Sequence, residues 1–181
     1  MREIEIKLKI PHGPELRKKF EDLGCVFSHP IEQEDIVYTK NTGNLEIFLS
    51  NPEFLRIRTE SNGKVIFTYK KDNKAGERGL DKLEYEFEVG SKSECHNFLN
   101  SIGYKEAVRI FKKRTKTTYN DFEICLDEVE HLGFFVEVEK AVSDDGDPEQ
   151  AFQDIESFIA SLGFDLSNQV KDGYDIQILR R

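Results

Sequence analysis

Apolar and charged residues alternate with a period of two through most of this chain, and this pattern constrains the fold more than any other feature. At the start of the chain, Glu3, Glu5 and Lys7 alternate with apolar residues. A period of two indicates β-strands with one apolar and one polar face. Strands are predicted near residues 2–10, 26–39, 45–50, 54–60, 64–71, 82–89, 105–119, 122–129 and 133–140.

Turn-forming residues separate several of these segments. Asn62-Gly63 is the strongest hairpin signal, and similar turns are expected at residues 41–44 and at Asn120-Asp121. Short strands that are joined by tight turns pair antiparallel. Other segments have a helical period and each is followed by a glycine that suits a left-handed cap. Helices are predicted at residues 14–23, from Ser91 to 102, and from Asp147 to 162.

Length and charge restrict the functional classes. A chain of 181 residues fits one domain, residues 1–181. The net charge of −9 provides no basic surface for nucleic acid, so a bound anion must meet a local positive pocket. The cysteines Cys25, Cys95 and Cys125 are odd in number and far apart, which suits a reducing cytoplasm and gives no metal-ligand spacing. With neither an export signal nor a membrane-spanning run, a cytoplasmic protein is expected.

The polar strand faces carry full charges instead of the usual mixture of neutral polar residues. Such faces include Glu3-x-Glu5-x-Lys7, Arg56-x-Arg58, Thr68-x-Lys70, Glu84-x-Glu86-x-Glu88, Lys112-x-Arg114-x-Lys116 and Glu137-x-Glu139. For any single strand, the simplest interpretation is a solvated outer face. Taken together, aligned carboxylates would repel one another, and a divalent cation would relieve that repulsion. The arginines and lysines would supply the donors that a polyphosphate needs.

These faces predict an α+β fold in which about eight antiparallel strands close into a β-barrel. The apolar faces would point outward to helices packed outside the barrel. The charged faces would line a polar tunnel, with carboxylates and cations on its walls.

The motifs resemble, in order and over nearly the whole chain, those of the CYTH superfamily, the triphosphate tunnel metalloenzymes. The spacing is most similar to the class IV adenylyl cyclase-like branch. The matching motifs are Glu3-Ile4-Glu5-Ile6-Lys7, Glu34-Asp35-Ile36-Val37-Tyr38, Leu55-Arg56-Ile57-Arg58, Thr68-Tyr69-Lys70, Glu84-Tyr85-Glu86, Lys112-Lys113-Arg114, Leu126-Asp127-Glu128-Val129, Leu132-Gly133-Phe134-Phe135 and Glu137-Val138-Glu139. Two positions depart from that branch: Phe134 replaces an aspartate, and Thr117 replaces a tyrosine.

The resemblance implies a tunnel enzyme that uses Mg2+ or Mn2+ and acts on a small-molecule triphosphate. The expected metal ligands are Glu3, Glu5, Asp127, Glu137 and Glu139, and the expected phosphate-binding residues are Lys7, Arg56, Arg58, Lys70, Lys112 and Arg114. Lys7, Lys70, Glu84 and Glu86 are expected to be catalytic, with the two glutamates orienting cations or joining a second metal.

Adenylyl cyclase chemistry, from ATP to cyclic AMP and pyrophosphate, is the first functional hypothesis. A triphosphatase acting on thiamine triphosphate, inorganic tripolyphosphate or a nucleoside triphosphate is the alternative. A non-catalytic module that binds a polyphosphate or a nucleotide ranks last because the acidic set is complete. No nucleic-acid or membrane partner is expected, and the oligomeric state stays open, a homodimer included.

Overall fold

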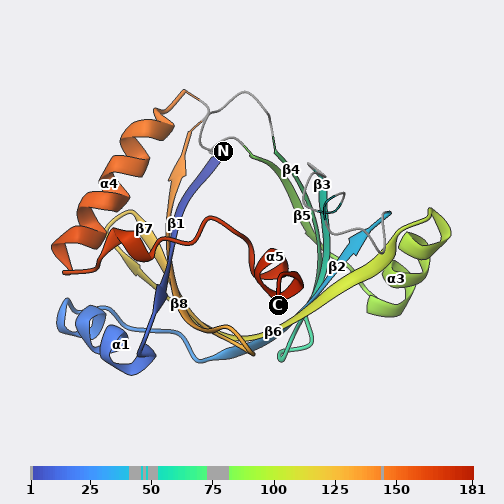
Figure 1. Cartoon of the computed structure of the whole chain (residues 1–181), viewed down its shortest axis with the longest axis horizontal. Coiled ribbons are helices and arrows are strands. Elements are labelled where there is room, and N and C mark those ends of the chain that lie inside the picture. Colours follow the sequence, from blue (N-terminus) through green and yellow to red (C-terminus); the bar gives the residue numbers. More distant parts are fainter. Residues whose placement is uncertain (1, 41–45, 47, 49–52, 73–81, 144) are drawn as a thin grey trace. The chain divides into compact units, whose positions relative to one another are not determined.

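The computed structural model describes residues 2–40, 46, 48, 53–72, 82–143 and 145–181 (Figure 1). Its strands are β1 (Arg2–Ile10), β2 (Ile31–Thr39), β3 (Glu53–Glu60), β4 (Val65–Asp72), β5 (Lys82–Glu88), β6 (Lys105–Tyr119), β7 (Phe122–Val129) and β8 (Gly133–Val142). Its helices are α1 (Gly13–Asp22), α3 (Lys92–Ser101), α4 (Pro148–Ser161), the short 3-10 helix η1 (Leu166–Asn168) and α5 (Tyr174–Leu179).

The chain forms two compact units that share strand β6. Unit 1 comprises Met1–Pro30 and Lys113–Lys171, and unit 2 comprises Ile31–Lys112 and Asp172–Arg181. The strands follow the order β1-β8-β7-β6 in unit 1 and β6-β2-β3-β4-β5 in unit 2. The pairs β1–β8, β7–β8, β2–β3, β3–β4 and β4–β5 are antiparallel, which confirms the predicted strand pairing.

Closure of the sheet into a barrel stays a prediction, because β1 and β5 stand at the two ends of the strand order. The segment that follows η1 lies along the outer edge of β1. Leu8 forms an isolated antiparallel bridge with Gln169, and the Val170 amide donates to the Lys7 carbonyl over 2.9 Å.

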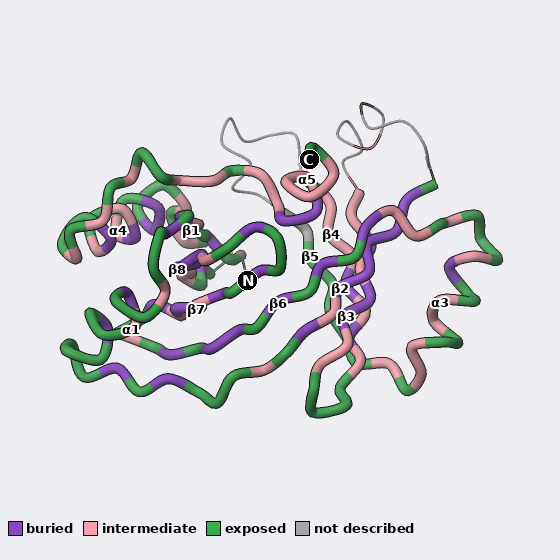
Figure 2. Tube along the Cα trace, turned by 60° about the horizontal axis from the view of Figure 1, so that its bottom comes forward, coloured by how far each residue is buried: buried purple, intermediate pink, exposed green. Residues whose placement is uncertain are grey.

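In unit 1, helices α1 and α4 cover the apolar face of the sheet (Figure 1). Alternation along β1 places Ile4, Ile6 and Leu8 on this face, where each is 1% exposed or less. Phe20 of α1 and Ile155 of α4 are fully buried there, and the purple segments of Figure 2 trace the same core. Burying the apolar face leaves the charged face of β1, β7 and β8 on the other side of the sheet.

In unit 2, helix α3 packs on the apolar face of the sheet, whereas α5 lies on the opposite face (Figure 1). Leu99 of α3 joins Ile36, Tyr38, Leu55 and Ile57 in one buried cluster. Asp35 of β2, Arg56 and Arg58 of β3, and Lys70 of β4 alternate with these apolar residues and therefore lie on the face that α5 occupies.

The predicted helix signals are confirmed. The Ser91 hydroxyl accepts from the Glu94 amide over 3.2 Å, and Asp147 caps α4 directly before Pro148. Gly24, Gly103 and Gly163 have φ values of 87°, 90° and 75°, the left-handed conformation that a glycine adopts at low cost.

Two expectations need correction. The strand predicted from residue 26 begins only at Ile31. The predicted turn at residues 41–44 lies outside the described residues, as does most of the predicted strand 45–50; Glu46 and Phe48 of that strand are described and are helical. The run 45–49 is apolar except for Glu46, and a short apolar run suits a helix as well as a strand.

Neither η1 nor α5 was predicted, because both are too short to show a clear helical period. Within the part of the chain that the structure describes, no helix has the length and apolar character needed to span a membrane.

Candidate functional site

Unit 1 brings carboxylates together in rows that cross three strands. Residues that face each other in an antiparallel pair have side chains on the same face of the sheet. Glu5 of β1 faces Glu139 of β8, which in turn faces Glu123 of β7. The neighbouring row consists of Lys7, Glu137 and Cys125. The register therefore explains why residues far apart in sequence share one charged face.

Two cations hold Glu137 within this face. The Arg114 guanidinium donates to Asp127 through Nε over 2.6 Å and through Nη2 over 2.5 Å. The same Nη2 also contacts Glu137, and Lys7 Nζ lies 3.1 Å from Glu137 Oε1. Burial alone would lower the pKa of Arg114, but Glu137 and Asp127 outweigh that effect and raise it. The network thus keeps a cation in a site that is nearly closed to water.

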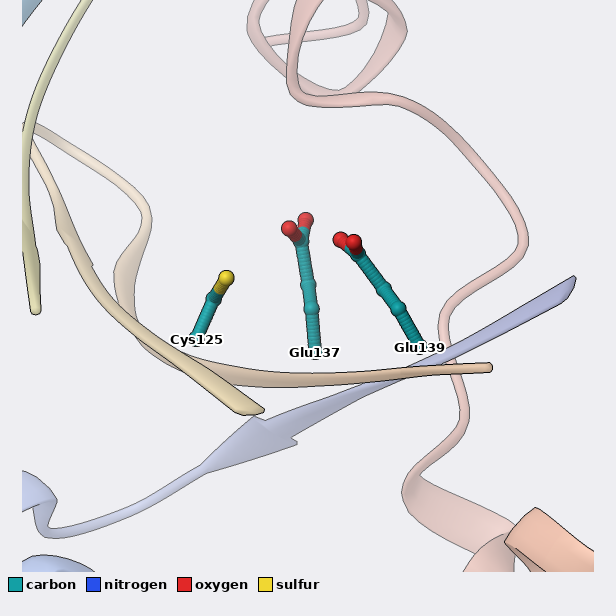
Figure 3. Close-up of side chains that lie close together, drawn as sticks. All are labelled: Cys125, Glu137 and Glu139. Atoms are coloured by element: carbon teal, nitrogen blue, oxygen red, sulfur yellow. The ribbon is translucent and has the colours of Figure 1, made fainter. Parts of the chain in front are cut away.

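Glu139 and Cys125 complete a compact group with Glu137 (Figure 3). One ligand atom from each of the three side chains lies within 4.8 Å of the others. Burial, and then the charges of Glu137 and Glu5, raise the pKa of Glu139 to about 7. This rise is the effect expected when like charges are crowded in a poorly solvated place.

Sequence reasoning missed Cys125, because spacing among the cysteines alone was considered. The signal was the alternation Glu123-x-Cys125-x-Asp127, which places the thiol on the charged face of β7.

Unit 2 carries the second charged cluster, which is centred on Asp35. Its carboxylate accepts from Arg58 Nε over 2.7 Å and from Arg58 Nη2 over 2.8 Å. Arg56 Nη1 adds a longer contact of 3.4 Å. Burial alone would raise the pKa of Asp35, but Arg56 and Arg58 hold it well below its usual range. Asp35, which sequence reasoning did not assign to the site, fixes two of the expected phosphate-binding arginines.

The glutamates of β5 orient further cations of unit 2. Arg56 Nη2 donates to Thr68 Oγ1 over 3.0 Å and to Glu86 Oε2 over 3.3 Å. Lys70 Nζ lies 2.8 Å from Glu84 Oε2. The antiparallel register explains both contacts, since Thr68 faces Glu86 and Lys70 faces Glu84 across β4 and β5.

Lys112 lies against the C-terminal helix α5. Its Nζ is 5.2 Å from the centre of the Tyr174 ring, within the range of a cation–π contact. Tyr174 is the first residue of α5, and Lys171, three residues earlier in the chain, is exposed.

Glu3 is exposed and faces Ala141, one step along the charged face beyond the row of Glu5 and Glu139.

The two departures from the cyclase-like branch have structural roles. A Cβ at Gly13 would lie 2.8 Å from the Phe134 ring, so this ring packs against the start of α1 on the other face of the sheet. The Thr117 hydroxyl donates to the Val26 carbonyl over 3.0 Å.

Comparison with known proteins places this arrangement in a family. The chain is 30% identical over 174 residues to a Methanocaldococcus jannaschii protein named "putative adenylate cyclase", covering 96% of this chain and 97% of the relative. A solved structure from Pyrococcus horikoshii OT3 superposes with a TM-score of 0.84 at 28% identity, covering 98% of each chain.

A Hippeastrum structure superposes with a TM-score of 0.62 at 18% identity, covering 90% of this chain and 88% of the other, and shows likeness of fold alone. The model of the CYTH domain matches residues 1–174. The chain therefore belongs to the CYTH family.

Proposed function

We propose that this chain is a metal-dependent enzyme that acts on an organic triphosphate. The observation that carries the proposal is the set of anchored cations on one face of unit 2. Arg56, Arg58 and Lys70 are each held by a carboxylate, and a triphosphate needs several fixed donors of this kind. Arg56 Nε is buried and has no hydrogen-bond partner among the described residues.

The acidic group of unit 1 fits a divalent cation by the chemistry of its donors. Glu5 and Glu139 face each other, and Glu137 is in the next row. Mg2+ and Mn2+ prefer carboxylate oxygens, and a divalent ion would remove the repulsion that raises the pKa of Glu139. We propose Glu5, Glu137 and Glu139 as the principal ligands, with Glu3 and Asp127 contributing through water.

The residues of the chain would act by positioning and by neutralising charge. A bound divalent ion supplies Lewis-acid stabilisation of the phosphate oxygens. Lys7 and Arg114 add positive charge beside the carboxylates, and the cations of unit 2 grip the phosphates. Glu84 and Glu86 orient Lys70 and Arg56 before substrate arrives, so that little reorganisation is needed during the reaction.

The first candidate reaction is adenylyl cyclisation. In it, the ribose 3′-hydroxyl of ATP loses its proton and attacks the α-phosphorus, and pyrophosphate leaves. The name of the Methanocaldococcus jannaschii relative supports this choice.

The second candidate is hydrolysis of a triphosphate, in which water attacks the terminal phosphorus, the bond to the diphosphate breaks, and phosphate is released. The Hippeastrum neighbour is described as having a dominant triphosphatase activity. The anchored cations favour neither reaction, because both reactions begin with a triphosphate that these cations bind.

Product analysis with purified protein decides between them. The protein is incubated with Mg2+ or Mn2+ and with ATP, thiamine triphosphate or inorganic tripolyphosphate in parallel. Cyclic AMP and pyrophosphate in equal amounts support the cyclase. ADP with phosphate, or much faster turnover of tripolyphosphate, supports the triphosphatase. Turnover that persists in excess chelator contradicts the metal-dependent proposal as a whole.

A further inference from the structure

The acidic face of unit 1 contains one side chain that a site for hard cations does not require. Cys125 is fully buried and faces Glu137 across β7 and β8. Its sulfur points toward the same region as the carboxylates of Glu137 and Glu139 (Figure 3). One ligand atom from each of the three lies within 4.8 Å of the others.

The upper limit of 4.8 Å on the distances between these ligand atoms exceeds the spacing around a coordinated ion by little more than 1 Å. With metal–ligand bonds of about 2.0–2.3 Å, two ligand atoms on a tetrahedral ion lie roughly 3.5 Å apart. Small rotations about the side-chain bonds of the two glutamates would close the difference, since both end in flexible carboxylates.

The charges of the group also suit a divalent ion. Glu137 is already paired with Lys7 and Arg114, so those two cations offset its negative charge. Glu139 and a Cys125 thiolate would then provide the two negative charges that neutralise a divalent ion. The Cys125 thiol donates a weak hydrogen bond to Glu123 Oε1 over 3.7 Å.

Sulfur changes which metals such a group prefers. Carboxylate oxygens suit Mg2+ and Mn2+, whereas a thiolate favours softer ions such as Zn2+ and Co2+. We infer that Cys125, Glu137 and Glu139 bind thiophilic divalent metals through sulfur as well as oxygen, and that these metals compete with the hard cation of the proposed function. The Cys125 S–H bond breaks on binding, its proton goes to solvent, and the sulfur electron pair forms the bond to the metal.

The metal-binding part of this inference stands on the geometry, whereas the competition rests on the proposed function. If the proposed function is correct, micromolar Zn2+ should inhibit turnover that Mg2+ supports, and Cys125→Ser should relieve that inhibition.

Cobalt provides a readout that does not depend on activity, because a thiolate ligand gives Co2+ an intense near-ultraviolet charge-transfer band. The protein has three cysteines, so the double variant Cys25→Ser/Cys95→Ser leaves Cys125 as the only thiol. We expect the band in the wild type and in this double variant, and its loss in Cys125→Ser. Glu139→Gln should keep the band but weaken Co2+ binding, by about 10-fold to 100-fold.

Two results would overturn the inference: no charge-transfer band in the wild type, or an undiminished band in Cys125→Ser. The double variant keeps the test valid if Cys125→Ser fails to fold. Turnover with Mg2+ but no band would leave the proposed function standing and remove the inference. A band without any triphosphate turnover would leave the metal-binding inference standing and remove the proposed function.

Discussion

Asp35 and Arg58 face each other across β2 and β3 and form a two-pronged ion pair, with contacts of 2.7 Å and 2.8 Å. Both are buried, with exposed fractions of 2% and 8%. This pair gives unit 2 a fixed guanidinium next to Arg56, and it makes the stability of the unit dependent on a single carboxylate.

Asp35→Asn should destabilise the protein by about 3 kcal/mol, because it removes the buried carboxylate that Arg58 and Arg56 share. Urea unfolding, followed by circular dichroism, measures this change. Replacing both partners, as in Asp35→Leu/Arg58→Met, should recover part of the lost stability, since Arg58 is removed together with its carboxylate, whereas Arg56 still loses its contact with Asp35. Equal losses in the single and the double variants would contradict this account.

The same pair predicts the behaviour of the protein in acid. The pKa of Asp35 is lower in the folded state than its ordinary value of 3.8, so the folded state binds fewer protons than the unfolded state. The stabilisation is therefore complete above pH ~4 and is lost as the pH falls below that. Asp35→Asn should show a shallower loss of stability between pH 5 and pH 2 than the wild type does, when urea midpoints are compared.

Arg56→Ala and Lys70→Ala should each weaken triphosphate binding by about 1–3 kcal/mol, because each removes a charge-assisted contact. Lys71→Ala is the matched control. Lys71 follows Lys70 on β4, but its side chain points to the opposite face of the sheet. There, Lys71 Nζ lies 3.9 Å from Glu53 Oε1. Calorimetry with a non-hydrolysable triphosphate measures the change. An equal loss in Lys71→Ala would indicate that net charge, not the anchored face, determines binding.

Glu5→Gln should abolish metal-dependent turnover without unfolding the protein. Glu5 is exposed and faces Glu139, so removing its charge relieves repulsion and should leave the melting temperature unchanged or slightly higher. Glu128→Gln is the control, since Glu128 is an exposed residue of β7 that faces Phe134, away from the acidic group. Full turnover in Glu5→Gln would show that this carboxylate is an ordinary solvated one.

The strand pattern could be predicted because alternation is a local feature of the sequence. Successive side chains of a strand point to opposite faces, so the face of one residue determines the faces of all the others. That is why Glu84 and Glu86 were expected beside cations, and Lys70 and Arg56 are the partners that the structure gives them. Partners on distant strands could not be predicted. Asp35 binds Arg58 because β2 pairs with β3 in one register, and that register is not visible in a single sequence.

Two further residues were missed for different reasons. In the sequence, Cys125 was compared only with the other cysteines, which lie far from it along the chain. Its neighbours in the structure are glutamates of the adjacent strand β8. Tyr174 belongs to a helix too short to show a period, and only tertiary packing places its ring against Lys112.

When chelator removes divalent metal, Glu139 should make the stability of the protein depend on pH. Its pKa is raised from 4.5 to about 7 by burial and by the charges of Glu137 and Glu5. The folded state therefore binds more protons than the unfolded state between these pH values, and the free energy of unfolding should fall as the pH rises from 4.5 to 7. The contribution is of the order of 2–3 kcal/mol.

Glu139→Gln cannot ionise, so the difference in stability between the variant and the wild type should grow in favour of the variant across this range. Mg2+ added at pH 8 should stabilise the wild type more than at pH 5.5, because at the lower pH the ion competes with a proton for Glu139. Chemical unfolding at a series of pH values, in chelator and then in Mg2+, measures both effects. Parallel pH profiles for wild type and Glu139→Gln would mean that the carboxylate is ionised throughout, and the crowding of charges around it would then be too weak to favour a bound cation.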